Sequence, residues 1–332
     1  SAASDVYKRQ TLKSVTVNAG KATSVPFLST ERGEWIRVKT DKNTMATVSF
    51  NYTSPDIRST SSDSIYKGLT TVDKTTTTGG LLYGLGDNRR ALGLLANVTV
   101  DGKISETGYY EMGDKLELIR KEDAKTADLI RSKFAIPQQV ISIEESSVLV
   151  VDDLGRRWRL PLGNETYKKL TDQGVLRICR EVATERDLFS CMGTFYELPA
   201  ENADGYAKIR PVSTHNYRIN DYASYRGMLV LTGVTPEDGK ENPHVVISDD
   251  GKAAVWVGVI DDLWTLGKPV GQGGPWKDTD VKTDVASDPY LIAFYDKKEL
   301  SLSHRSDKNV VITVEVLSLI HISEPTRRSY IS

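Results

Sequence analysis

The sequence predicts an all-β protein, and a β-propeller of about five blades is the favoured architecture. Short alternating or β-branched runs recur along the chain, separated by Asp, Asn, Gly and Pro, and helical periodicity is confined to two short segments. A chain of 332 residues is long enough for one large domain or two modest ones. Tandem β-sandwich domains remain the alternative fold.

Strand-like runs follow one another from one end of the chain to the other. They are Ser14–Val17, Trp35–Lys39, Ala46–Tyr52, Leu94–Val100, Val140–Ile143, Ser147–Val151, Met228–Thr232, His244–Ile247, Ala253–Val259, Pro289–Tyr295 and Val310–Val316. Turns such as Asp101-Gly102 and Asp249-Asp250-Gly251 contain residues that tolerate the positive φ of tight hairpins. The helical periodicity lies at Asp123–Lys133, with a short turn expected at Asn164–Asp172.

Two similar segments favour a repeated hairpin unit. Val148–Trp158 and Val245–Trp256 both read as a strand, an Asp-Asp turn and a second strand that carries Trp. Asp153–Trp158 resembles most of an Asp-box, the hairpin turn common in sialidase-type propellers, with Val151 in place of its usual leading Ser. Such turns are structural, and their repetition favours a propeller over paired sandwiches.

A polar stretch divides the chain. Residues 53–79 are rich in Ser, Thr, Asp and Gly and are expected to form a linker or long loop. This stretch would separate a truncated β element at 11–52 from a propeller-like domain at 80–316. At roughly 40–45 residues per blade, the larger part would hold about five blades.

Both ends of the chain resemble translated sequencing-library adapters. Residues 1–10 resemble the in-frame translation of one transposase adapter, and residues 317–332 resemble its partner followed by a short index. We therefore expect native sequence only at 11–316. The native termini, with any signal peptide, are expected to lie outside this chain.

Composition argues against several classes of protein. The chain has 43 Lys and Arg against 45 Asp and Glu, and the adapter-like ends hold four of the basic and two of the acidic residues, so the interior carries a net charge near −4. A general nucleic-acid binder needs a positive surplus. No apolar run approaches the roughly 18 residues that span a bilayer. Cys179 and Cys191 lack zinc-site spacing, so neither a metal nor a cofactor is expected, and free thiols are favoured over a bridge.

Polar and aromatic residues are densest at 179–226 and 260–276, which points to carbohydrate as the partner. Tyr and Trp faces stack on the C–H surfaces of sugars, while Asp, Asn, Arg and His bond to hydroxyl groups. Substrate binding is expected from Arg218, Asp221, Tyr225, Arg226, Trp264, Lys268 and Trp276.

Glycoside hydrolysis is the favoured activity, and it needs two carboxyl groups in different protonation states. Glu197 with Asp261 or Asp262 would supply them, and His215 is the titratable group in these stretches that is poised near neutral pH. Both loop regions would then have to meet over one hollow.

Two alternatives stay open. Arg210, Arg218 and Arg226 would suit a uronate or a sulfated sugar, and with His215 or Tyr225 as base they would allow β-elimination by a lyase. A non-catalytic glycan-binding module would show the aromatic side chains without a carboxyl pair about 5–10 Å apart. Acidic residues beside Arg on strands are usually cross-strand ion pairs, so a structural role for these carboxylates also has to be considered. The oligomeric state stays open.

Four segments carry a family resemblance. Gly193–Pro199, Thr214–Asp221, Gly258–Trp276 and Ser287–Lys297 resemble a group of large, mostly uncharacterised exported bacterial proteins. Members of this group occur among polysaccharide-degradation genes and are thought to be propeller-like. The resemblance implies a periplasmic or secreted location and a role in polysaccharide use, and it supplies no catalytic residues.

Overall fold

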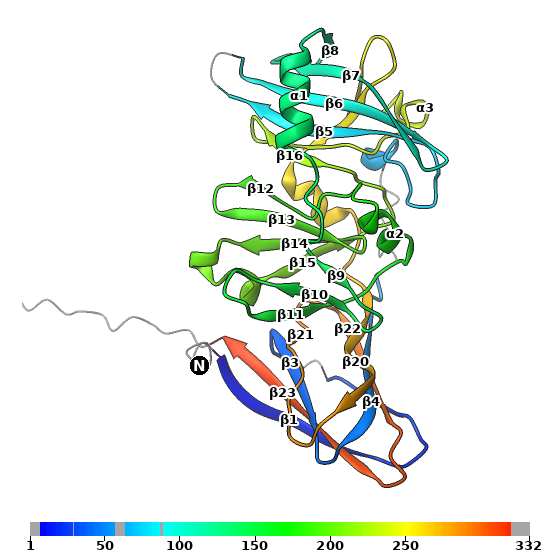
Figure 1. Cartoon of the computed structure of the whole chain (residues 1–332), viewed down its shortest axis with the longest axis vertical. Coiled ribbons are helices and arrows are strands. Elements are labelled where there is room, and N and C mark those ends of the chain that lie inside the picture. The colour runs from blue at the N-terminus through cyan, green and yellow to red at the C-terminus, as the bar shows by residue number, and fades with distance from the viewer. Residues whose placement is uncertain (1–6, 29, 57–63, 87–88, 320–332) are drawn as a thin grey trace, which may run out of the picture.

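Short antiparallel strands make up most of the chain, as the alternating sequence predicts. The computed structural model describes residues 7–28, 30–56, 64–86 and 89–319. Their sheets follow one another along an elongated column (Figure 1). The protein is therefore all-β.

The described strands form five sheets. One has the order β1-β23-β3-β21-β11-β10-β9, with β1 at Tyr7–Val17, β23 at Val310–Leu319, β3 at Trp35–Thr40, β21 at Tyr290–Leu291, β11 at Arg157–Leu160, β10 at Val148–Val151 and β9 at Ser142–Ile143. Another has the order β2-β22-β4-β20, with β2 at Thr23–Pro26, β22 at Lys297–His304, β4 at Thr44–Thr53 and β20 at Gly271–Val281.

The other three sheets are local in sequence. The first contains β5 (Thr77–Leu85), β6 (Ala91–Val100), β7 (Lys103–Met112) and β8 (Leu118–Lys121). The second contains β12 (Cys179–Ala183), β13 (Arg186–Cys191), β14 (Thr194–Pro199) and β15 (Arg210–Thr214). The third has the order β16-β17-β19-β18, with β16 at Tyr222–Tyr225, β17 at Met228–Leu231, β19 at Ala254–Gly258 and β18 at Val245–Ile247.

Helices are short and connect the sheets. The described α-helices are α1 (Ala124–Lys133), α2 (Thr166–Asp172) and α3 (Pro236–Gly239), and the described 3-10 helices are η3 (Ser64–Tyr66), η4 (Glu201–Ala203), η5 (Gly205–Lys208) and η6 (Ile260–Thr265). The helix predicted at Asp123–Lys133 is confirmed, since α1 covers Ala124–Lys133. Asp123 caps this helix by accepting a hydrogen bond from the backbone N–H of Thr126. Within the described residues, no helix combines the length and apolar character needed to cross a membrane.

Strands from both ends of the chain build a β-sandwich. β3 and β4, which the sequence assigns to a separate element at 11–52, pair with β23 and with β22 and β20. The buried ring of Trp35 packs against Trp158 in a tilted arrangement at 4.7 Å between centroids, and its Nε1–H donates to the carbonyl of Ala207. The polar stretch at 53–79 thus separates segments in the sequence but not in the packing.

Three sheets and the β9–β11 strands pack face to face above the sandwich. The β12–β15 sheet meets the β16–β19 sheet through a core that includes Leu188, Phe195, Leu231 and Trp256. The opposite face of the β16–β19 sheet meets the β5–β8 sheet through Leu94, Tyr110, Val230 and Val255. Alternating apolar residues on central strands supply both faces.

The described sheets follow one another in a line with two ends (Figure 1). α1 covers the outer face of the β5–β8 sheet through Ala127 and Ile130, and the sandwich follows the β9–β11 strands at the other end (Figure 1). Within the described residues no sheet closes on itself and no ring of sheets is completed. The all-β class is therefore confirmed, whereas the β-propeller of about five blades, complete or incomplete, that the repeated hairpins predict is not confirmed by the described residues.

Much of the segment at 64–79 is buried, although its polarity predicts a linker or loop. The residues Tyr66, Leu69, Thr70, Val72, Thr77 and Thr78 are buried, whereas residues 73–76 are exposed. The buried Thr70 donates its N–H to the carbonyl of Gly233, and its hydroxyl bonds to those of Thr77 and Thr235. Paired hydroxyl and backbone groups can be buried at little cost because each finds a partner. Composition alone therefore misses this segment's burial.

The Asp-box-like hairpin is present, with Asp152 in the bonding position instead of Asp153. The Asp152 carboxylate accepts hydrogen bonds from the backbone N–H groups of Leu154 and Arg156 and from Nε1–H of Trp158. Ser248 occupies the matching place in the other hairpin, where its hydroxyl accepts from the N–H of Ala253. The two turns share a structural role, as their sequences predict.

Candidate functional site

The two polar stretches predicted to meet do so at the junction between the β12–β15 and β16–β19 sheets. The guanidinium carbon of Arg210 lies 5.2 Å from the ring centroid of Trp264 on η6. Nearby, the hydroxyl of Thr214 and the backbone of Val270 exchange hydrogen bonds of 3.1 Å. β15 and η6 are thereby joined.

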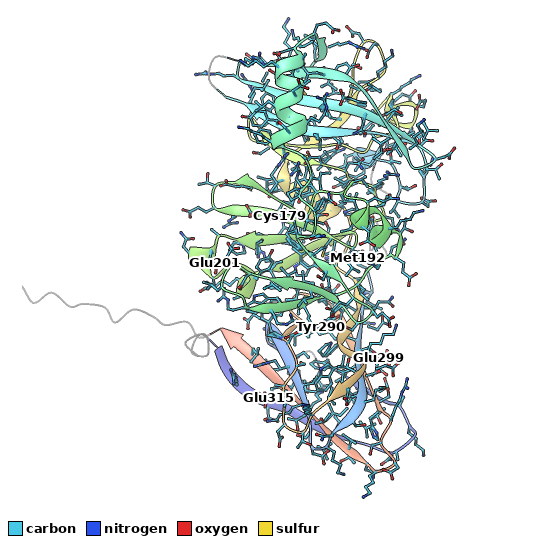
Figure 2. All side chains as sticks on the ribbon, in the orientation of Figure 1. Cys179, Met192, Glu201, Tyr290, Glu299 and Glu315 are labelled. Carbon is cyan, nitrogen blue, oxygen red and sulfur yellow. The ribbon has the colours of Figure 1, made fainter. Side chains whose placement is uncertain are left out.

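Three charged side chains form a row across the β12–β15 sheet: Arg186, Glu197 and Arg210. Glu197 pairs directly with Arg210 on β15 in the strand register and diagonally with Arg186 on β13. Its Oε2 accepts from Nε of Arg210 at 2.8 Å, and its Oε1 accepts from Nη1 of Arg186 at 2.9 Å. Figure 2 shows Glu201, which follows β14, and Met192, which precedes it, at opposite edges of the column of sheets. Glu197 lies near the end of β14 that leads to Glu201.

η6 presents large apolar side chains to solvent beside this row. Trp264 is 48% exposed, and Val259 and Ile260 at the start of the helix are also exposed. Asp262 fixes the start of η6, since its Oδ2 accepts from the backbone N–H of Val259 at 2.8 Å. Exposed large apolar groups that gather in one place often mark a binding surface. We call Arg186, Glu197, Arg210 and Trp264 the Trp264 surface.

A hollow of about 580 Å³ opens at the same junction. Its lining residues come from both sheets and from η6: Glu181, Val182, Ala183, Thr184, Ser224, Gly227, Met228, Leu229 and Ile260. The volume falls within the range of small-ligand sites, roughly 300–1,000 Å³. Apolar walls with hydroxyl and carboxylate groups at the rim suit a ligand that has both C–H and O–H surfaces.

Glu197 is held as an ion-paired carboxylate. Two guanidinium groups bind its two oxygens, and its side chain keeps 20% of its exposure. Both carboxylate oxygens are therefore already bonded, and Glu197 orients Arg210 against Trp264.

His215 is a core side chain. It is 3% exposed and packs against Phe195 at 4.9 Å between ring centroids, and its Nδ1 accepts from the N–H of Tyr217. Burial is the larger effect and lowers the pKa of His215 to about 3. The hydrogen bond with the backbone of Tyr217 acts in the opposite direction and raises this pKa. Among the residues that the structure describes, none forms a hydrogen bond with Nε2. The imidazole is therefore neutral at physiological pH.

Asp221 and Arg218 are also interior. The fully buried carboxylate of Asp221 binds Arg177 and Arg180 and accepts from the backbone N–H of Leu82 at 2.9 Å. It thereby joins three sheet-forming segments. Arg218 is 5% exposed, and its Nε has no hydrogen-bond partner in the described part of the chain. Neither residue faces the Trp264 surface in any contact of the described chain.

The two acidic residues of η6 differ in their surroundings. Asp262 is half-buried and acts as a helix cap through its side chain, and its carbonyl accepts from the hydroxyl of Tyr66. Asp261 is exposed, and no hydrogen bond or ion pair of its side chain is found within the described residues. Asp261 is thus the carboxylate in this region that is open to a ligand.

Of the remaining predicted residues, Tyr225 and Arg226 lie together, because Nε of Arg226 donates to the hydroxyl of Tyr225 at 3.2 Å. Tyr225 donates its hydroxyl to the carbonyl of Arg90, and Arg226 pairs with Asp114, both beside a second depression of about 540 Å³. Lys268 is half-buried in the loop after η6. Trp276 on β20 is 7% exposed and belongs to the main core.

Sequence reasoning missed Arg186 and the apolar residue Ile260. The register of the β13–β14 hairpin, whose turn is Met192-Gly193, places Arg186 diagonal to Glu197, and reading that register would have found it. No sequence pattern predicts that Ile260 is exposed, because its exposure depends on the 3-10 helix η6, which the sequence does not predict.

Metal and thiol chemistry find no support at this site. Within the described residues, no group of three His, Cys, Asp or Glu side chains is placed to hold a metal ion. Cys179 and Cys191 are free thiols, and burial raises the pKa of each above its usual value. Buried thiols with raised pKa are poor nucleophiles.

Comparisons with known proteins find no matching family model, curated protein or solved structure. The candidate site consists of the exposed Trp264 with Arg210 against its ring, the row of Arg186, Glu197 and Arg210, and the adjoining hollow.

Proposed function

We propose that the protein is a non-catalytic glycan-binding module that holds a plant or algal polysaccharide along the Trp264 surface. One observation carries the proposal: a half-exposed tryptophan whose ring is fixed by Arg210 stands beside a hollow between two sheets. A rigid exposed ring offers stacking area at low entropic cost. Charged groups at the row and Asp261 offer hydrogen bonds to hydroxyl groups.

The same geometry makes hydrolysis by the predicted residues a weaker proposal. Glu197 is neutralised by Arg186 and Arg210, and Asp262 caps η6. A hydrolase needs one carboxyl group that is protonated and a second that is free. Elimination loses support in the same way, because His215 is buried and the hydroxyl of Tyr225 is bonded to a carbonyl group.

The propeller-like architecture and the extracytoplasmic location remain part of this proposal. Sheets that pack face to face in series, and two hairpin turns with matching bonds at Asp152 and Ser248, support a propeller-related arrangement. The resemblance of 180–226 and 256–302 to exported proteins of polysaccharide use supports a periplasmic or secreted location.

Affinity electrophoresis tests the proposal. Native gels containing polygalacturonate or alginate, which are acidic polysaccharides, should retard the protein in at least one case. Trp264→Ala should lose that retardation, with affinity reduced roughly 30-fold for loss of about 2 kcal/mol at an aromatic hot spot. Leu154→Ala, which removes another exposed apolar side chain outside the Trp264 surface, is the matched control and should run as the wild type. Equal retardation of the Trp264→Ala and Leu154→Ala variants would refute the assigned surface.

A further inference from the structure

A second large hollow lies in the β-sandwich, and none of its lining residues belongs to the Trp264 surface. Its volume is about 890 Å³, and it is lined by the loop after β2, the end of β4 and the turn between β21 and β22. None of the residues predicted from sequence to bind a ligand line it. The volume lies near the upper end of the range for small-ligand sites.

Phe294 stands at this hollow in an unfavourable backbone conformation. Its φ is 67°, and its side chain is 59% exposed. A bulky L-residue at positive φ is strained, because Cβ crowds the following carbonyl oxygen. Glycine or asparagine would adopt this conformation more readily. The exposed ring gains little from packing to offset the strain, so folding alone does not explain it.

The turn that carries Phe294 is fixed on both sides. The backbone N–H groups of Ile292 and Ala293 donate to the carbonyl of Glu34, and the buried Tyr295 stacks on Tyr52 at 4.1 Å between centroids. Anchoring of its neighbours forces the chain to turn at Phe294 and directs that ring outward. The ring is therefore displayed by a rigid frame.

Polar groups around the hollow are held in place with lone pairs to spare. Oε1 of Glu299 accepts from the hydroxyl of Ser24 at 2.6 Å, and Oδ2 of Asp296 accepts from the hydroxyl of Ser54 at 2.7 Å. Leu28, 62% exposed, lies on the facing loop. Each carboxylate keeps a second oxygen that can accept from a ligand hydroxyl group.

The balance of charge indicates what the hollow would accept. Four acidic residues line it, Glu31, Glu34, Asp296 and Glu299, against three basic ones, Arg32, Lys297 and Lys298. A slight acidic excess disfavours anionic ligands, while oriented carboxylates favour donors such as hydroxyl groups. Exposed apolar groups facing fixed acceptors suit the two kinds of surface on a sugar.

We propose that this hollow is a second carbohydrate site, which binds a neutral oligosaccharide by stacking a sugar ring on Phe294. It shares with the proposed function only the chemical class of the ligand. The residues of the two sites are different, so the two assignments stand or fall separately.

Isothermal titration calorimetry with laminarihexaose, cellohexaose and xylohexaose tests the second site. Wild-type protein and the Trp264→Ala variant should both bind at least one of the three. Phe294→Gly removes the ring and relieves the positive φ, so it should weaken that binding at least tenfold. Its thermal midpoint should equal or exceed that of the wild type, since the backbone strain is lost.

Three results would overturn the second site. Binding that Trp264→Ala abolishes and Phe294→Gly leaves unchanged would assign all recognition to the Trp264 surface and leave the proposed function intact. Absence of heat with every hexasaccharide would remove the second site, while the polysaccharide gels would still decide the first. A lowered thermal midpoint for Phe294→Gly that accompanies the loss of binding would give the ring a structural role.

Discussion

The guanidinium group of Arg210 joins the β12–β15 sheet to η6, because it binds Glu197 across β14 and β15 while its carbon lies 5.2 Å from the ring centroid of Trp264. A cation against one part of the ring restricts the movement of a side chain that is 48% exposed. Fixing an aromatic ring before a ligand arrives lowers the entropy cost of binding. The ion pair at Glu197 thus contributes to the shape of the surface.

Removing the cation should weaken binding less than removing the ring. For Arg210→Ala we expect about a threefold loss of polysaccharide affinity, in keeping with about 0.5–1 kcal/mol for an exposed cation–π contact. Arg305→Ala, which removes an exposed cation that pairs with Asp278 outside the Trp264 surface, is the matched control and should bind as the wild type. Tryptophan fluorescence anisotropy should report a freer ring only in Arg210→Ala. An equal loss in both variants would show that net charge, and not ring position, governs the affinity.

Asp221 should matter for stability and not for binding. Asp221→Asn would leave Arg177 and Arg180 buried without their counter-charge, and we expect unfolding free energy to fall by about 3–5 kcal/mol. The control is Asp114→Asn, because this exposed carboxylate pairs with Arg226 at the surface, where such pairs contribute about 1 kcal/mol or less. Urea denaturation measures both. A loss below about 1 kcal/mol in Asp221→Asn would contradict the role assigned to this ion pair.

The two aspartates of the Asp-box-like turn should be separable by mutation. Burial opposes the charged form of Asp152, but its bonds to Trp158 and Arg156 outweigh burial and leave its pKa below the usual value. Asp152→Asn should therefore cost about 1–3 kcal/mol near neutral pH, since one buried donor loses its acceptor. That difference from the wild type is present above the unfolded-state pKa and shrinks as pH falls through the lower folded-state value. The exposed Asp153 is the control, and equal losses in Asp153→Asn would restore the motif register that the sequence suggests.

His215 should make the protein less stable in weak acid. Its pKa is about 3 in the folded state and 6.5 in a model peptide, so between these values only the unfolded chain binds the proton. The contribution is complete above pH 6.5 and is lost below it at up to about 1.4 kcal/mol per pH unit. His215→Asn keeps an acceptor near the Tyr217 N–H and should show a smaller fall in urea midpoint between roughly pH 7.5 and 5. Identical pH profiles in the two proteins would contradict a buried neutral imidazole.

Local patterns in the sequence predict much of the fold. Runs of alternating or β-branched residues predict strands such as β4 and β6, and the capping residue Asp123 predicts the start of α1. Asp101-Gly102 forms a hairpin turn in which both residues have positive φ. Sequence patterns do not show which sheets become neighbours. Pairing of β4 with β22 and β20 depends on contacts more than 200 residues apart, and nothing local encodes them.

The candidate site was only partly predictable. Sequence density brings Glu197 and Trp264 into one region, and the structure does join their segments through Arg210. Burial is the property that residue type does not reveal: His215 and Trp276 both have chemistry suited to a sugar site, yet both lie in the interior. Residue type therefore identifies candidates, and packing decides which of them reach solvent.

Whether the protein holds a polysaccharide without cleaving it is the most direct test of this account. Wild-type protein should be incubated with each polysaccharide that retards it, and new reducing ends and unsaturated ends should be measured over time, with Glu197→Gln in parallel. We expect retention on the polysaccharide and no release of either product by wild type or variant. Steady release of sugar ends that Glu197→Gln abolishes would establish a hydrolase and contradict the non-catalytic function proposed from the Arg186–Glu197–Arg210 row.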